Sequence, residues 1–370
     1  MSKVAIAKVD ESIYDTVVKA VRDLGETVVA RGDRVLLKPN LVHTMSFGEN
    51  DMTSPEIIEA VARYCLDCGA AEVVIGEGPG SYQPRSRLRE CFTRTGVTKI
   101  AAELGIEWVL FDEHEYRTFR NISDCTPKEF HVTEYAFSFD KFINLPVLKT
   151  HYLTTVTLAM KNLKGTLKYE DKQKFHSPDI YRAITELNKI VRPTFNIIDA
   201  TKWKKGSQKL IIAGADIVAV DTVGCALMGI DPMEVRTITL GGLAGLGDCD
   251  ISKIDVVGED LRHLKLKVAL PQEQLKKYFP LLEITGADKA CSGCIFPLIS
   301  GLLLIGERGE KLKQPLRICI GKKPDIPSGK RYLLVGDCTA TESEEENHVA
   351  GCPPDRTELY SRLVKVISSL

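Results

Sequence analysis

The chain has 370 residues, of which 44% are hydrophobic and 27% are charged, as in a globular protein with two or three domains. Its net charge of −1 argues against nucleic acid or an anionic membrane as a partner. Residues 3–9 read as a strand rather than a signal peptide, and the longest apolar stretch, residues 295–305, is too short to span a bilayer. We therefore expect a cytoplasmic protein whose 11 cysteines serve as thiols or metal ligands rather than disulfides.

Up to about residue 285, apolar runs of strand length alternate with segments of helical periodicity. This pattern predicts the α/β class, with a mainly parallel sheet and flanking helices. Residues 12–24 carry apolar side chains on one helical face, and Ser54 and Asp216 are typical N-caps of two further helices. The expected strands are Val4–Val9, Arg34–Lys38, Glu72–Ile75, Glu107–Phe111, Lys141–Leu145, Thr194–Ile198, Lys209–Ile212 and Lys253–Val257.

The chain changes character near its last hundred residues. Pro271 and Pro280 flank a segment, residues 268–288, that we interpret as a linker. We therefore predict an α/β domain with a ligand cleft over residues 1–285. A small cysteine-rich iron–sulfur module is predicted over residues 286–370.

Four cysteines of this module indicate a metal centre. Cys291 and Cys294 form a Cys-x-x-Cys pair, Cys338 follows an apolar strand, and Cys352 precedes a proline. Two thiols three residues apart can bind one centre from a single turn, and a closing Cys-Pro is frequent among iron–sulfur ligands. Zinc also accepts four thiolates, but zinc sites usually repeat the close pair. The spacing favours a 4Fe–4S cluster, with zinc or unligated thiols as alternatives.

Polar residues also follow two predicted strands directly. Lys38 and Asn40 leave the second strand, and Gly76-Glu77-Gly78 leaves the third. Ligands of parallel α/β sheets bind beyond the carboxyl ends of the strands, so Lys38 and Asn40 could hold an anion. Gly76 and Gly78 would let backbone amides approach a ligand, with Glu77 as an acid or base. Plain turns at both places are the alternative reading.

A third group of polar residues follows the strand that ends at Leu145. Lys149, His151 and Lys161 lie within a short stretch together with several threonines, and His176 comes before the next helix. A buried lysine can have a pKa low enough to act as a nucleophile or base. We therefore expect Lys161, His151 and Glu77 to be catalytic. Lys38, Asn40, Gly76, Gly78, Lys149 and His176 are expected to bind a cofactor or ligand.

The order of these motifs resembles the family known as domain of unknown function 362. The similar segments are residues 35–42, 145–151, 160–165, 216–221 and 245–247. The resemblance implies an α/β fold, often with an iron–sulfur segment, but no particular reaction. Residues 200–206, which follow Asp199, depart from the family pattern by carrying lysines and a tryptophan.

A second resemblance, to the lactate racemase family, rests on spacing. His151 and Lys161 are 10 residues apart (161 − 151), and His176 follows 15 residues later (176 − 161). The resemblance implies His151 as a base, Lys161 as the residue that bonds a nickel-pincer nucleotide, and His176 as a nickel ligand. The racemase motif Asp-His-Thr-Arg is absent from this sequence.

Three functions are consistent with these residues. The first is a cytosolic 4Fe–4S redox or electron-transfer enzyme that acts on a small anionic or nucleotide-like ligand, with a redox partner protein. The second is a racemase or isomerase with a lysine-linked nucleotide-type cofactor and a structural cluster. The third is a non-enzymatic carrier of clusters or electrons.

Overall fold

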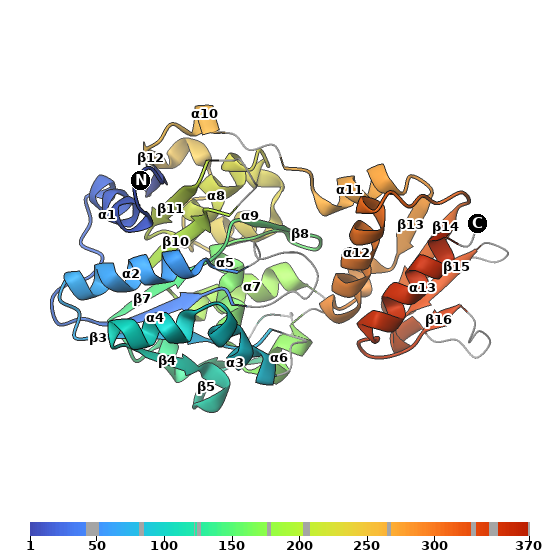
Figure 1. The fold of residues 1–370 in the computed structure, drawn as a ribbon, viewed down its shortest axis with the longest axis horizontal. Helices are drawn as coiled ribbons and strands as arrows, with labels where there is room; N and C mark the ends of the chain where they lie inside the picture. Colours follow the sequence, from blue (N-terminus) through green and yellow to red (C-terminus); the bar gives the residue numbers. More distant parts are fainter. Residues whose placement is uncertain are drawn as a thin grey trace. The chain divides into compact units, whose positions relative to one another are not determined.

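The computed structural model describes residues 1–41, 52–80, 85–121, 123, 127–175, 179–202, 208–264, 268–326, 331–339 and 347–368. The chain forms two compact units (Figure 1). The first contains Met1–Thr150, Thr154–Lys172 and Ile180–Val268. The second contains His151–Leu153, Gln173–Asp179 and Ala269–Leu370.

The first unit is built on an eight-stranded sheet in the order β12-β1-β11-β10-β7-β2-β3-β4. Neighbouring strands run parallel except β11, which is antiparallel to both β1 and β10. The predicted α/β class and mainly parallel sheet are therefore confirmed, and each of the eight predicted strands overlaps one strand of this sheet. The strands are β1 (Lys3–Lys8), β2 (Arg34–Pro39), β3 (Glu72–Glu77), β4 (Glu107–Leu110), β7 (Lys141–Leu145), β10 (Phe195–Ala200), β11 (Leu210–Gly214) and β12 (Asp255–Gly258).

Helices α1 and α2 cover one face of this sheet together with α3 and α4 (Figure 1). Ser12 and Ser54 cap α1 and α2 as the sequence predicts, because each hydroxyl accepts a hydrogen bond from a first-turn amide. The apolar residues of α1 and α2 pack on alternate residues of the strands to form the main core. These helices are α1 (Ile13–Leu24), α2 (Pro55–Asp67), α3 (Arg85–Arg94) and α4 (Val97–Leu104).

On the rest of the first unit, α8 packs on β1, β10 and β11, and α5 lies between α8, α7 and β7. Asp216 caps α8, as predicted, by accepting hydrogen bonds from the amides of Val218 and Ala219. Two hairpins, β5–β6 and β8–β9, stand apart from the main sheet. The elements are α5 (Ala159–Asn162), α6 (Tyr169–Lys174), α7 (Ile180–Ile190), α8 (Ile217–Leu227), α9 (Arg236–Leu243), α10 (Leu261–Leu264), β5 (Tyr116–Arg120), β6 (Glu129–Thr133), β8 (Lys149–His151) and β9 (Thr155–Thr157).

The second unit has its own parallel sheet, in the order β13-β14-β15-β16, and its own apolar core. The predicted linker over residues 268–288 is wrong, because a helix and a strand of this unit occupy it. Pro271 is the first residue of that helix, a position that proline favours. The elements are α11 (Pro271–Tyr278), α12 (Ser292–Glu307), α13 (Arg356–Ser368), β13 (Leu282–Thr285), β14 (Leu316–Ile320), β15 (Tyr332–Val335) and β16 (His348–Val349).

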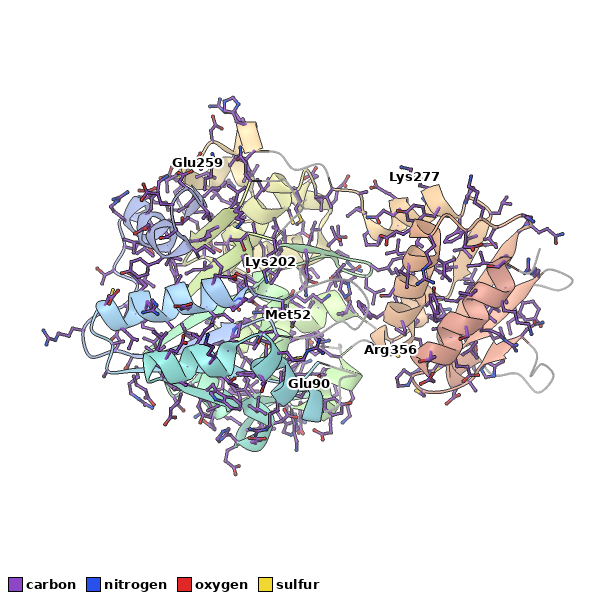
Figure 2. All side chains as sticks on the ribbon, viewed as in Figure 1. Met52, Glu90, Lys202, Glu259, Lys277 and Arg356 are labelled. Carbon is purple, nitrogen blue, oxygen red and sulfur yellow. The ribbon has the colours of Figure 1, made fainter. Side chains whose placement is uncertain are left out.

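Across the described ranges, no helix has both the length and the apolar character needed to cross a membrane. Most charged side chains stand on the surface, as Glu90 of α3 and Lys277 of α11 do (Figure 2). A lysine or glutamate that is fully buried is therefore unusual in a protein and needs a reason.

Candidate functional site

A row of polar side chains crosses the middle of the first sheet near the carboxyl ends of its parallel strands. Lys38 of β2 pairs in register with Asn144 of β7, which pairs with Asn196 of β10. All three are fully buried. The Asn144 amide donates to the Asn196 side-chain oxygen at 3.0 Å, and the Asn162 amide donates to the Asn144 side-chain oxygen at 2.8 Å. This chain of amides ties α5 to the sheet, because Asn162 is the last residue of α5.

Lys38 and Glu77 form a fully buried ion pair at this row. The Lys38 amine lies 2.9 Å from one carboxylate oxygen of Glu77 and 3.0 Å from the other, and neither side chain is exposed. Glu77 also accepts hydrogen bonds from the amides of Gly78 (2.9 Å) and Leu41 (3.3 Å). Burial lowers the pKa of Lys38, and the Glu77 charge acts in the opposite direction. Glu77 is thus held as a carboxylate by four donors.

Two glycines let the chain approach this ion pair closely. A side chain on Gly165 would fall on the Glu77 carboxylate and within 2.5 Å of Lys38 Cε. A side chain on Gly78 would meet the Gly165 carbonyl oxygen and would lie 2.8 Å from the Lys172 amine. That amine donates to the carbonyls of Pro79 (2.8 Å) and Gly165 (3.0 Å), so Lys172 joins the two glycine-bearing loops.

Replacement of Gly165 by alanine should destabilise the first unit by roughly 1–3 kcal/mol, the usual cost of overpacking, because the buried ion pair beneath it cannot move aside. The matched control is Gly224→Ala in α8, where the new methyl group would meet only the ends of leucine and isoleucine side chains at 3.3–3.5 Å. Urea unfolding followed by tryptophan fluorescence measures both. Equal stability of the two variants would contradict the close approach described here.

The short helix α5 is fixed at its start by a buried carboxylate. Asp221 of α8 accepts hydrogen bonds from the amides of Ala159 (2.6 Å) and Met160 (3.0 Å). Burial raises the pKa of Asp221 to about 7, against the lowering effect of these two hydrogen bonds. With Asp221 at one end and Asn162 at the other, α5 holds Lys161 in a defined position.

Three half-buried lysines form a group beside α5, which we call the lysine group: Lys149, Lys161 and Lys164. The Lys161 amine donates to the hydroxyls of Thr154 (3.0 Å) and Thr157 (3.3 Å). Among the residues that the structure describes, no carboxylate forms an ion pair with Lys161. The Lys149 amine lies 3.5 Å from the Asn40 side-chain oxygen.

The amines in and near this group have low pKa values because they are buried and repel one another. Burial lowers the pKa of Lys161 far below its ordinary value, and the charges of Lys164 and Lys149 add to the effect. Burial, followed by the charge of Lys172, lowers the pKa of Lys164 to about 7. Burial lowers the pKa of Lys172 to about 8. An anion bound among these amines would favour their charged forms.

The predicted site residues lie in three different situations. Lys38 with Glu77, Asn40 with Lys149, and Lys161 all belong to the first unit and interact as described above. Gly76 has a packing role, because a side chain there would collide with the ring of Phe111.

The two predicted histidines stand apart from this description. His151 belongs to the second unit, and its Nδ1 accepts a hydrogen bond from the amide of Leu153 at 3.1 Å. His176 lies outside the described residues.

Sequence reasoning assigned no role to several residues of the site. Lys164 stands inside a segment that the sequence already singles out, and Asn144 is a polar residue within an apolar strand, so both carried a usable signal. Lys172 on α6 and Asp221 on α8 did not, because their proximity to the site depends on how those helices pack.

The four candidate cysteines of the second unit gather at the carboxyl ends of its strands. Cys291 precedes α12 and Cys294 lies in its first turn, while Cys338 follows β15 and Cys352 follows β16. The pKa of the Cys294 thiol is raised by its hydrogen bond with Cys291, by burial, and by the charges of Cys352 and Cys338. The four sulfur atoms are therefore neighbours.

Glycine also permits close approach at this group of thiols. Gly336, with φ of 90°, precedes Cys338 by two residues, and a side chain there would lie 2.8 Å from the Cys294 sulfur. Over the described ranges, no three His, Cys, Asp or Glu side chains are placed so that they could hold a single metal ion. Zinc requires four thiolates at about 2.3 Å from one centre, whereas an iron–sulfur cluster holds its thiolates farther apart. The described arrangement is more open than a closed zinc site.

The first unit is thus an α/β domain with a buried polar row and a lysine group at its strand ends. The chain belongs to the family described as domain of unknown function DUF362, whose model matches residues 35–226. The resemblance expected from the sequence is confirmed at the level of this family.

Three individual proteins are similar to this chain. The thylakoid-associated protein sll1697 of Synechocystis is 28% identical over 233 residues, which cover 59% of this chain and 70% of that protein. The lactate racemase apoprotein of Thermoanaerobacterium thermosaccharolyticum is 14% identical with a TM-score of 0.39, over 60% of this chain and 57% of the racemase. A crystal structure of a Thermotoga maritima protein is 13% identical with a TM-score of 0.38, over 83% of this chain and 69% of that protein. Likenesses at these TM-scores carry no argument about activity.

Proposed function

We propose that this protein is an iron–sulfur redox enzyme whose first unit binds a small anionic or nucleotide-like ligand at the lysine group. The observation that carries the anion site is the clustering of three half-buried amines at the ends of parallel strands. Lys161 has only threonine hydroxyls as hydrogen-bond partners and no ion pair among the described residues. Like charges brought together and partly removed from water raise the free energy of the unliganded site, and an anion relieves that repulsion.

The position of the group supports the same proposal. Asn40 and Lys149 interact where β2 ends and β8 begins, and Lys161 and Lys164 follow from α5 and the turn after it. In parallel α/β sheets, ligands bind at the carboxyl ends of strands. The buried Lys38–Glu77 pair and Lys172 lie below full burial and hold the loops in place. We assign them to support of the site and Lys149 and Lys164 to contact with the ligand.

The redox part of the proposal rests on the second unit. Cys291, Cys294, Cys338 and Cys352 are the residues that would hold a 4Fe–4S cluster. Such a cluster supplies one-electron transfer when it is bound. The start of α12 places its amides near Cys291 and Cys294, and a helix N-terminus favours thiolates. Cys338 and Cys352 are exposed, so electrons could pass to a redox partner protein at that edge.

Calorimetric titration with sulfate tests the anion site, because the charge of sulfate is constant over the pH range of interest. Lys164→Gln should weaken sulfate binding about tenfold or more, the value of one charge-assisted hydrogen bond. The matched control is Lys99→Gln, which removes a 78%-exposed lysine of α4 and should leave the affinity unchanged. Absence of saturable binding, or equal affinities of the two variants, would contradict the anion site.

The same titration has a predicted pH dependence. As the pH rises through about 7 and 8, Lys164 and then Lys172 lose their protons and the site loses positive charge. Sulfate affinity should therefore fall with rising pH, by up to about tenfold per pH unit for each linked proton. Titrations in buffers of different ionisation enthalpy should show proton uptake on binding near neutral pH.

A further inference from the structure

We infer that Lys161 is a nucleophile that forms an imine with a small carbonyl compound carrying a negative charge. This inference rests on the proposed anion site and goes beyond it, because it assigns a covalent step and a substrate class. Lys149 and Lys164 would bind the anionic group of the substrate, and Lys161 would attack its carbonyl carbon.

The hydrogen bonds of Lys161 orient its amine. The Thr154 hydroxyl donates its proton to the carbonyl of Val156 at 2.8 Å, so toward Lys161 it can only accept. Thr157 supplies a second acceptor at 3.3 Å. A neutral amine has two N–H bonds and one lone pair. With both N–H bonds directed at the two threonines, the lone pair points away from them and is available for bond formation.

The backbone that supplies these acceptors is strained. Thr155 has a φ of 63°, a conformation that is rare for a β-branched residue, and the amide of Val156 donates to the carbonyl of Thr154 at 2.6 Å. Strain of this kind persists only where surrounding contacts enforce it, and it occurs often at functional sites. Here the strained turn brings the buried Thr154 hydroxyl to Lys161.

Other lysines nearby lack this combination. Lys38 is fully buried and paired with Glu77. Lys172 is only 1% exposed and donates to two carbonyl oxygens. Lys161 is half-buried and therefore reachable, it is fixed through both ends of α5, and its low pKa keeps the amine neutral at neutral pH. A lysine desolvated beside other cations is a known form of activated amine.

The proposed step is balanced without any further reagent. The Lys161 nitrogen forms a bond to the carbonyl carbon and gives a carbinolamine. Its two amine protons move to the former carbonyl oxygen, which leaves as water, and a carbon–nitrogen double bond remains. The imine withdraws electrons from the neighbouring carbon atom, and hydrolysis returns the lysine.

Borohydride trapping with pyruvate as the probe tests the inference on the full chain. Intact mass and peptide mapping should show one reduced adduct, located on Lys161, while the exposed Lys99 remains unmodified. Excess sulfate should protect Lys161 by occupying the adjoining site. No adduct, or an adduct spread over surface lysines, would overturn the inference.

Two variants make the test independent of the anion site itself. Lys161→Arg should retain sulfate binding and lose the adduct, because arginine keeps a donor group but is not a nucleophile. Thr157→Val should slow trapping, and Thr157→Ser should restore it, because the hydroxyl and not the methyl group orients the amine. Sulfate binding without any pyruvate adduct would remove the imine and leave the proposed anion site standing. Trapping without sulfate binding would do the reverse.

Discussion

Lys38→Met should lower the free energy of unfolding of the first unit by about 3–5 kcal/mol. The change leaves the Glu77 carboxylate with neither exposure to water nor a countercharge, because both side chains are 0% exposed. Removing one partner of a buried ion pair is strongly destabilising for this reason. Both tryptophans of the sequence, Trp108 and Trp203, belong to the first unit, so their fluorescence during urea unfolding reports on that unit alone.

The double variant Lys38→Met/Glu77→Leu provides the matched control. It removes both charges together, so much of the lost stability should return. Lys99→Met, which breaks the exposed pair with Glu103, should change stability little. A Lys38→Met variant as stable as Lys99→Met would show that Glu77 is relieved in another way, and the account of the buried row would fail.

The main sheet could be predicted from the sequence because its strands are buried on both faces. Strands such as β2 and β10 therefore read as continuous apolar runs, and the regular alternation with helices fixes their type. The hairpin β5–β6 was missed because β5 is largely exposed and carries charged residues, so it has no apolar pattern. The three-residue strands β8 and β9 are too short to show any periodicity.

The candidate site could be predicted only in part. The rule that ligands bind at strand ends pointed to Lys38, Asn40 and Glu77, and the structure joins Lys38 to Glu77 directly. The same rule could not identify Lys172 or Asp221, which reach the site from helices through tertiary packing. It also could not show that Lys38 and Glu77 are fully buried, which gives them a supporting position rather than one in contact with solvent.

The boundary between the units shows a different limit of sequence reasoning. Pro271 and Pro280 suggested a linker, but proline at the first position of a helix is as favourable as proline in a loop. The strand β13 pairs with β14, which lies more than thirty residues later in the chain, so its partner is not visible from local pattern.

Cys352→Ser should abolish iron binding by the second unit. Cys352 follows β16, and its thiol lies near those of Cys291 and Cys338, which affect its pKa after burial does. A serine at this position cannot supply the thiolate that the proposed cluster requires. Visible absorbance and iron content of anaerobically prepared protein measure the effect.

The matched control comes from the other Cys-x-x-Cys pair, at the end of α2. Cys65 is fully buried in the core of the first unit, whereas Cys68 is half-buried, so Cys68→Ser disturbs packing less. This variant should bind iron as the unmodified chain does. Equal iron loss in both variants would point to a general effect on folding rather than to a ligand.

Elemental analysis of the anaerobically purified, unmodified chain tests the iron–sulfur proposal most directly. The account predicts iron and acid-labile sulfide in equal amounts, both lost together in Cys352→Ser and both kept in Cys68→Ser. One zinc per chain with neither iron nor sulfide would contradict it and would make Cys291, Cys294, Cys338 and Cys352 a structural zinc site.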